Sequence, residues 1–252
     1  MNPRIDRQSN NDGKLALVTG ASRGLGRALA ETLVGRGWRV IADARDGAAL
    51  REWLAPLGEA ATAVPGDIAD PAHRAELARR AAAHGRLDLL VASAGALGPS
   101  PLPPLLEYPL DALDAVLHTN VTAQLGLLKT LWPLLRDTAA VITVTSDAAR
   151  KAYPGWGGYG ASKAALEQLT AVLAAEHPER RIYAVDPGDM RTAMHQAAFP
   201  GEDIGDRPLP GAAARWIVRL AEGYAPNGRY SVSDLVLRLG SEPAAASTGT
   251  PA

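Results

Sequence analysis

A tyrosine and a lysine four residues apart, Tyr159 and Lys163, begin a stretch whose apolar residues have helical spacing. The chain has four lysines and six tyrosines, so chance would place a tyrosine four residues before a lysine about 0.1 times in such a chain. A phenol has a pKa of about 10, and a cation one helical turn away favours its ionised form. The pair could therefore donate and recover a proton, although two unrelated polar residues sharing a helix face remain an alternative.

A glycine-rich stretch, TGASRGLG at residues 19–26, follows an apolar run and precedes a segment with helical spacing. Gly20 permits a tight turn, Gly24 lets the backbone approach a diphosphate, and Gly26 allows close packing of the helix. Amides at the start of a helix carry partial positive charge and attract anions. We interpret the stretch as a nucleotide-binding loop, with a purely structural turn as the alternative.

The elements that must position these residues alternate along the chain. Apolar runs predict strands and 3.6-residue periodicity predicts helices. Strands that alternate with helices of this length form parallel crossovers, so we expect a doubly wound sheet with helices on both faces. Pro133 falls inside the longest helical stretch and is expected to bend or end it. Strands are predicted over 14–20, 38–44, 61–67, 87–95, 139–146 and 181–188, and helices over 23–37, 47–58, 71–85, 110–135 and 158–176.

Composition excludes several classes of protein and site. The 252 residues are 47% hydrophobic and 21% charged with a net charge of -1, which is typical of a soluble globule and disfavours nucleic-acid or anionic membrane partners. Without cysteine there is no disulfide, thiolate nucleophile or thiolate metal site, and a cytoplasmic location is expected. No apolar run is long enough to span a membrane and no secretory signal is predicted. We expect one catalytic domain over 13–240, with flexible tails at 1–12 and 241–252.

The glycine loop resembles that of the short-chain dehydrogenase/reductase family, in which T-G-x-x-x-G-x-G opens a single dinucleotide-binding domain. Other markers of the family follow in order over almost the whole chain: Asp67, Asn120, Ser146, Tyr159-x-x-x-Lys163, and Pro187-Gly188 followed by Thr192. The resemblance implies an α/β Rossmann-type domain with a parallel sheet of about seven strands. It also implies an oxidoreductase that interconverts a carbonyl and a secondary alcohol.

The resemblance assigns a catalytic tetrad to Asn120, Ser146, Tyr159 and Lys163. Tyr159 would be the general acid/base, Lys163 would favour its phenolate and hold the nicotinamide ribose, Ser146 would orient the substrate oxygen, and Asn120 would hold a relay water. Singly, Ser146 and Asn120 would more often satisfy nearby backbone. We expect no metal site, and we interpret His118 and His195 as non-ligands.

The family places its dinucleotide against the ends of several strands, and the second strand decides which dinucleotide is bound. Ala44 occupies the position where NAD enzymes carry a ribose-binding acid, and Arg45 follows it, so together with Arg23 the sequence favours NADP(H). The alternative is that Asp43 binds the ribose and Arg45 is merely solvated. The expected cofactor-binding residues are Gly20, Ser22, Arg23, Gly24, Leu25, Gly26, Arg45, Asp67, Ile68, Ala94, Gly95, Tyr159, Lys163, Pro187, Gly188 and Thr192.

A long connection over 188–210 interrupts the alternation of strands and helices and is predicted to be a substrate lid. It carries two of the three methionines and the only phenylalanine. We expect a hydrophobic or aromatic substrate, although these residues could equally pack on the protein core. The expected pocket residues are Leu97, Tyr153, Trp156, Met190, Met194 and Phe199.

Three features depart from the family pattern. ASAG at 92–95 replaces the usual N-N-A-G or N-A-A-G, which predicts some loss of rigidity at that loop. Asp186 stands where the family favours a small residue, and the sequence offers no reason for it. The segment 227–240 lacks the family's glycine-rich ending, which leaves the last strand uncertain.

Apolar surface on 110–135 and 158–176 exceeds what one sheet face needs, so a homodimer or homotetramer is expected, as in the family. The competing hypothesis for function is a non-catalytic NADP-binding sensor or scaffold on the same fold. Such a protein normally has a broken Tyr-Lys pair, whereas Tyr159 and Lys163 are both present. A nucleoside-dependent methyltransferase would share the sheet but would not need Ser146, Tyr159 and Lys163 at these spacings.

Overall fold

The structure is a computed structural model, and it describes residues 13–223 and 225–239. The predicted tails at 1–12 and 241–252 lie outside the described residues. The strands are β1 (Leu15–Val18), β2 (Arg39–Ala44), β3 (Ala61–Pro65), β4 (Leu87–Ala92), β5 (Leu135–Val144), β6 (Arg181–Asp186) and β7 (Gly228–Ser231). The helices are α1 (Gly24–Val34), α2 (Gly47–Leu54), α3 (Pro71–His84), α4 (Leu110–Leu117), α5 (Ala123–Leu131), α6 (Gly157–Glu176), α7 (Ala193–Ala198), α8 (Pro210–Glu222) and α9 (Val232–Leu239).

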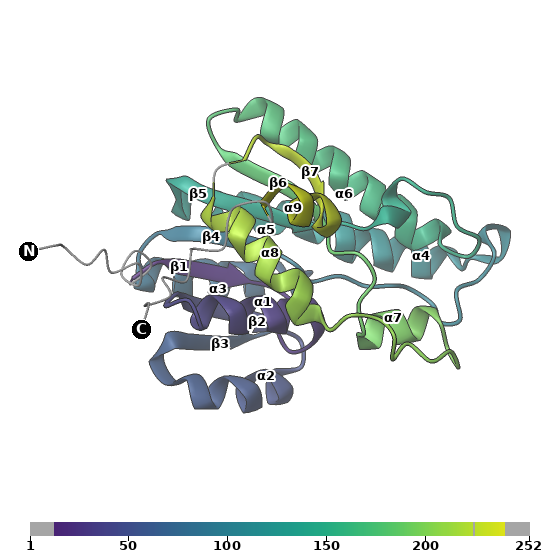
Figure 1. The fold of residues 1–252 in the computed structure, drawn as a ribbon, viewed down its shortest axis with the longest axis horizontal. Coiled ribbons are helices and arrows are strands. Elements are labelled where there is room, and N and C mark those ends of the chain that lie inside the picture. Colours follow the sequence, from purple (N-terminus) through teal and green to yellow (C-terminus); the bar gives the residue numbers. More distant parts are fainter. Residues whose placement is uncertain (1–12, 224, 240–252) are drawn as a thin grey trace, which may run out of the picture.

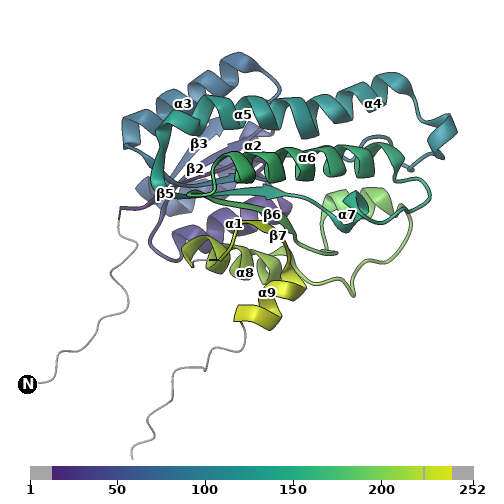
Figure 2. The same cartoon turned by 90° about the horizontal axis from the view of Figure 1, so that it is seen from above.

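The described strands form one parallel sheet in the order β3-β2-β1-β4-β5-β6-β7. Figure 2 shows α3, α4, α5 and α6 on one side of this sheet and α1, α8 and α9 on the other. The predicted doubly wound α/β fold with about seven strands is therefore confirmed. Strand order reverses between β1 and β4, and ligands of such sheets bind beyond the carboxyl ends of the strands at this point.

Alternation along the strands builds a separate apolar cluster on each face. Leu17 and Ile41 join the cluster that contains α3 and α5, whereas Val18 and Val40 join the cluster that contains α1, α2 and α8. Successive side chains of a strand point to opposite faces, so a strand with helices on both sides must be apolar throughout. This requirement explains the continuous apolar runs in the sequence.

The long helical stretch predicted over 110–135 is divided. After α4 the chain makes a π-helical turn over His118–Thr122, continues as α5, and passes through a 3-10 turn at Trp132–Leu134. β5 begins at Leu135, four residues earlier than predicted. Proline has no N–H to donate to the preceding helical turn, so Pro133 ends the helix as expected.

One further helix boundary differs from its prediction, and the C-terminal strand that the sequence left open is formed. The helix predicted over 47–58 ends at Leu54, because a 3-10 segment with Pro56 follows and Gly58 adopts a positive φ of 56°. The uncertain C-terminal strand is present as β7, which pairs in parallel with β6 and leads into α9. None of the helices in the described part of the chain has the length and apolar composition needed to cross a bilayer.

Candidate active site

The glycine loop follows β1 at the point where strand order reverses. Gly20 and Gly24 have positive φ values of 69° and 57°, a region that side chains other than glycine rarely adopt. A Cβ on Gly20 would lie 2.8 Å from the Cα of Ala94, and one on Gly26 would lie 2.3 Å from the carbonyl oxygen of Gly20. The loop therefore packs against the end of β4 and against α1 at distances that only glycine permits.

The start of α1 is suited to an anion. Its N-cap residue, Arg23, makes no side-chain hydrogen bond to the first-turn amides, and such amides attract negative charge. Thr192, from the connection after β6, lies against the same loop, because a Cβ on Gly24 would be 3.5 Å from its Cγ2. Two of the segments predicted to bind the cofactor thus meet at one place.

The loop after β4 is held by two side chains, one from the glycine motif and one from α5. Thr19 Oγ1 accepts hydrogen bonds from the amides of Ser93 and Ala94 over 3.1 and 3.0 Å. Gln124 Nε2 donates to the carbonyl of Ala94 over 2.6 Å. These bonds restrain the loop that carries ASAG in place of the usual asparagines. Sequence reasoning missed Thr19 and Gln124, although Thr19 belongs to the glycine motif.

Asn120 lies in the π-helical turn and is fully buried. Its side chain exchanges two hydrogen bonds of 2.8 Å with the backbone of Ala96 and donates to Ser162 Oγ over 2.9 Å. Ser162 in turn donates to the carbonyl of Tyr159 over 2.7 Å. The amide side chain therefore ties the loop after β4 to the first turns of α6.

Tyr159 and Lys163 face the sheet from the start of α6 and are 8% and 4% exposed. Lys163 Nζ donates to the carbonyl of Val144 over 2.9 Å and lies 5.6 Å from the centre of the Tyr159 ring. A Cβ on Gly95 would be 3.3 Å from Asn120 Oδ1 and 3.5 Å from Lys163 Nζ. Asn120, Lys163 and the backbone of Gly95 thus converge, although the residues are distant in sequence.

Burial dominates the electrostatics of this pair. Burial and then the nearby carboxylates of Asp186 and Asp147 raise the pKa of Tyr159, while a hydrogen bond with Ser146 opposes them. Burial also lowers the pKa of Lys163 to about 8. Because its pKa is raised, the Tyr159 phenol is protonated at neutral pH. Ser146 itself lies just after β5, where its Oγ accepts from the amide of Ala148 over 3.2 Å.

The ends of β2 and β3 form the remaining side of the site. Arg45 is exposed, and the Asp67 carboxylate accepts from the amide of Ala69 over 2.9 Å. The side chain of Ile68 is buried in the core, where it packs with the cluster that contains α3 and α5. Asp43 is 1% exposed and lies 2.6 Å from His73 Nε2. The alternative in which Asp43 takes the ribose does not fit this geometry, because its carboxylate already has a buried partner.

Asp186, which the sequence left unexplained, shapes the turn after β6. Its Oδ1 accepts from the amide of Gly188 over 3.0 Å, and its Oδ2 accepts from Arg229 of β7 over 2.9 Å. Gly188 has a positive φ of 72°. Thr192 then caps α7 by accepting from the amide of His195 over 3.1 Å. The carboxylate thus fixes the path of the Pro187-Gly188 turn.

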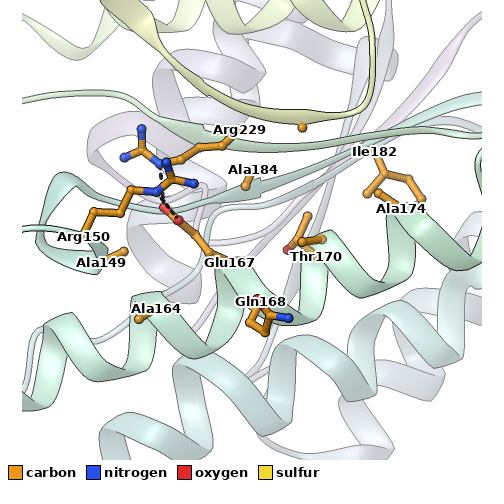
Figure 3. Close-up of a pocket in the computed structure, with 12 residues that line it drawn as sticks. Ala149, Arg150, Ala164, Glu167, Gln168, Thr170, Ala174, Ile182, Ala184 and Arg229 are labelled. Atoms are coloured by element: carbon orange, nitrogen blue, oxygen red, sulfur yellow. Dashed lines mark hydrogen bonds and ion pairs between the residues drawn. The ribbon is translucent and has the colours of Figure 1, made fainter.

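Arg229 also contacts the helix that carries Tyr159. It donates to Glu167 of α6 over 2.7 Å, and Glu167 accepts further bonds of 2.9 Å from Arg150 and Thr145. Figure 3 shows the Glu167 carboxylate joined to both arginines in a pocket beside α6. Burial raises the pKa of Glu167, but the hydrogen bonds from its partners prevail and lower it. Neither Glu167 nor Arg229 was predicted, because no local pattern links residues 62 positions apart.

Aromatic rings cover Tyr159. Its ring centre lies 5.7 Å from that of Trp156, which is 6.4 Å from Tyr153 and 5.9 Å from Phe199 of the predicted lid. Leu97 belongs to the same small cluster. The predicted pocket residues therefore divide: Leu97, Tyr153, Trp156 and Phe199 gather near Tyr159, whereas two methionines lie elsewhere. Met190 packs against the cluster that contains α1 and α8, and Met194 is exposed.

The connection between β6 and α8 contains α7, which stands beside the start of α6 (Figures 1 and 2). Ser100 Oγ, from the loop after β4, donates to the carbonyl of Ala197 in α7 over 2.6 Å. The connection is therefore attached to the loop after β4 by this hydrogen bond, and to the aromatic residues near Tyr159 by the contact between Phe199 and Trp156. In the described part of the chain, no group of three or more His, Cys, Asp or Glu side chains is arranged to hold a metal ion.

Comparison with known proteins agrees with this geometry. The family model for short chain dehydrogenases matches residues 14–203. The uncharacterized oxidoreductase YciK of Escherichia coli (strain K12) is 35% identical over 200 residues, which cover 75% of this chain and 79% of the relative. Serine 3-dehydrogenase of Rhizobium radiobacter is 35% identical over 181 residues, which cover 70% of this chain and 72% of the relative.

Solved structures are similar over most of the chain. A short chain dehydrogenase from Shigella flexneri 2a str. 301, complexed with NADP, matches with a TM-score of 0.82 and 29% identity, covering 90% of this chain and 100% of the other. One from Escherichia coli CFT073, complexed with NADPH, matches with a TM-score of 0.81 and 30% identity, covering 90% and 99%. On its motifs, its sheet order and these similarities, the chain belongs to the short-chain dehydrogenase/reductase family of oxidoreductases.

Proposed function

We propose that the protein is an NADP(H)-dependent oxidoreductase that interconverts a ketone or aldehyde and the corresponding alcohol. The observation that carries this proposal is the convergence of Asn120, Lys163 and Gly95, next to Tyr159 and at the same sheet edge as the glycine loop. A proton donor, a cation and a nucleotide-binding loop at one edge are what carbonyl reduction by a dinucleotide requires.

The residues present fit a dinucleotide. Gly24 leaves the loop without a side chain where a diphosphate would approach, Gly20 and Gly26 let the loop pack closely against Ala94 and α1, and α1 begins without a side-chain cap. The loop would hold the diphosphate, Arg45 the 2′-phosphate, Asp67 the adenine side and Lys163 the nicotinamide ribose. When bound, the nicotinamide supplies or accepts the hydride. The NADP and NADPH complexes of the two similar structures support this choice of cofactor.

The side chains manage the proton. In the reducing direction Tyr159 donates its phenolic proton to the substrate oxygen, which becomes a hydroxyl, and Ser146 donates a hydrogen bond that orients the same oxygen. The positive charge of Lys163 stabilises the phenolate left behind. Asn120, held by Ala96 and Ser162, keeps the adjacent turn in place for a water that returns the proton. In the oxidising direction the phenolate accepts the proton instead.

The surroundings of Tyr159 favour an apolar substrate. Trp156, Phe199 and Leu97 lie around its ring, and burial of apolar surface against them would bind a hydrophobic or aromatic carbonyl compound. We assign residues 188–210 as the lid over this substrate within one catalytic domain. The hydrogen bond from Ser100 to Ala197 would hold the lid down.

Exposed apolar side chains support self-association. Leu105, Leu106 and Leu110 are 66%, 100% and 76% exposed, and Val172 on α6 is 42% exposed. A homodimer or homotetramer would cover such surface. A chain without cysteine needs no oxidising compartment, and we assign it to the cytoplasm.

Purified protein tests this function when NADPH binding and NADPH consumption are measured separately. We expect binding to quench tryptophan fluorescence, and consumption to occur with hydrophobic ketones or aldehydes from a broad panel. Binding without turnover across the panel would instead favour a non-catalytic sensor. Absence of NADPH binding would remove both functions.

A further inference from the structure

His73 and Asp43 form a buried pair that proton transfer at Tyr159 does not use. His73 Nε2 lies 2.6 Å from Asp43 Oδ1, and their side chains are 7% and 2% exposed. An ionised carboxylate can only accept, so the imidazole donates this hydrogen bond. Burying such a pair costs desolvation free energy. The pair lies at the carboxyl ends of β2 and β3, on the side of the sheet where the dinucleotide is proposed to bind.

Asp43 is attached to the glycine loop through both its side chain and its backbone. Its carboxylate accepts a hydrogen bond from the backbone of Gly20, and its carbonyl accepts from the amide of Ala21 over 2.8 Å. Burial raises the pKa of Asp43, whereas His73 and the Gly20 amide act in the opposite direction. The carboxylate therefore lies underneath the loop, where these partners hold it.

His73 contacts the neighbouring strand end as well. Asp70 caps α3 by accepting from the amide of Ala72 over 2.8 Å, which places His73 in the first turn of the helix. A Cβ on Gly66 would lie 2.1 Å from His73 Nδ1, so the ring packs directly against the backbone before Asp67. The imidazole therefore fills the space between the end of β2 and the end of β3.

Two negative charges lie close to the proposed site of the 2′-phosphate. Asp43 is two residues before Arg45, and burial is the main cause of the raised pKa of Asp43, to which the charge of Asp67 adds the smallest part. A carboxylate turned toward the ribose would accept from the 2′-hydroxyl of NADH and repel the 2′-phosphate of NADPH. The direction in which Asp43 points thus bears on the choice between the two dinucleotides.

We infer that His73 is a specificity-determining residue for NADPH, because it holds the Asp43 carboxylate beneath the glycine loop and away from the ribose. Arg45, the first residue after β2, is then the side chain that contacts the 2′-phosphate. This inference rests on the proposed NADP(H) function. It explains how a chain with an acid near the end of β2 can still prefer the phosphorylated dinucleotide.

The test compares dissociation constants for NADPH and NADH, measured by fluorescence, in variants of the full chain. For His73→Phe, which fills the space but cannot donate, we expect the NADPH to NADH preference to fall about 10-fold, the scale of one charge contact. His73→Gln retains a donor and should stay within about 3-fold of wild type. His84→Phe, at the other end of α3, is the matched control. The double variant Asp43→Asn/His73→Phe should recover the wild-type preference, since the released group is then neutral.

Other outcomes overturn the inference. Equal weakening of both dinucleotides by His73→Phe, without recovery in the double variant, would show a structural role only. If His73→Phe does not fold, Asp43→Asn still decides: loss of NADH affinity by about 10-fold would mean that the carboxylate already reaches the ribose in the wild type. Failure of the wild type to bind either dinucleotide would instead contradict the proposed function itself.

Discussion

Arg229 Nη2 donates to Asp186 Oδ2 over 2.9 Å, and this bond joins strand β7 to the turn after β6. The same arginine donates to Glu167 over 2.7 Å on the helix that carries Tyr159. One side chain thus connects the Pro187-Gly188 turn to α6. It also partly offsets the negative charge of Asp186, which raises the pKa of Tyr159.

Asp186→Asn should make alcohol oxidation possible at lower pH. Removing a negative charge near Tyr159 stabilises the phenolate, so its pKa falls and the rising limb of the pH profile moves down by about one unit or less. The measurement is kcat for oxidation as a function of pH. Asp189→Asn, an exposed carboxylate of the connection before α7, should leave that limb in place. An upward shift, or none, would contradict the assigned role of Asp186.

Tyr159→Phe should lower kcat by about 1000-fold or more while leaving the dissociation constant of NADPH nearly unchanged. The variant keeps the buried ring but loses the acid and its hydrogen bond to the substrate. Stopped-flow turnover and equilibrium binding separate the two effects. Tyr230→Phe removes a hydroxyl that donates to the Pro226 carbonyl, and it should retain activity. Normal turnover in Tyr159→Phe would exclude the proposed proton transfer.

Lys163→Met should abolish turnover yet stabilise the fold at neutral pH. Burial lowers the pKa of Lys163 to about 8, below the value of about 10.4 for an unfolded chain. Below pH 8 Lys163 is charged in both states, and its burial lowers the free energy of unfolding. This loss of stability disappears as the pH rises from about 8 toward the unfolded-state pKa of about 10.4. The linked free energy is of the order of 1–3 kcal/mol.

Denaturant unfolding of both proteins from about pH 7 to pH 10 checks this linkage. The stability advantage of Lys163→Met over wild type should be largest near neutral pH and shrink above pH 8. Lys129→Met, at an exposed position of α5, should show no such trend. A difference that stays constant with pH would mean that Lys163 has an ordinary pKa.

Arg45→Asp should reverse the charge presented to the 2′-phosphate and shift preference from NADPH toward NADH. Because Arg45 is exposed, the substitution should leave the melting temperature within a few degrees of wild type. The ratio of kcat/KM for the two dinucleotides measures the shift, and Arg51→Asp on the neighbouring helix is the control. An unchanged ratio would overturn the assignment of Arg45.

Local patterns predicted most of the fold. Apolar runs and helical periodicity placed the six strands that were predicted, because the central strands are buried on both faces and the helices pack one face against the sheet. The failures lie at boundaries. Leu135 begins β5 although the helical pattern continues to it, because Pro133 ends the helix and pairing with β4 recruits the following residues.

Motif spacing likewise identified Tyr159, Lys163, Asn120 and the glycine loop, since a helical turn or a strand end is a local property. Side-chain direction and long-range pairing are not local. Asp43 and Ala44 are adjacent in sequence but point to opposite faces of β2, and only the packing of α3 supplies the histidine that holds Asp43. Arg229, the partner that Asp186 and Glu167 share, comes from β7, which the chain reaches more than forty residues after Asp186.

The sequence by itself determined the family, the alternation of strands and helices, and the residue types available for proton transfer. The tertiary structure decided which charges face one another: His73 with Asp43 beneath the glycine loop, and Arg229 with Asp186 beside the turn after β6. The reason is physical. Secondary structure follows from short-range periodicity, whereas the environment of a buried charge depends on elements that meet only when the sheet is assembled.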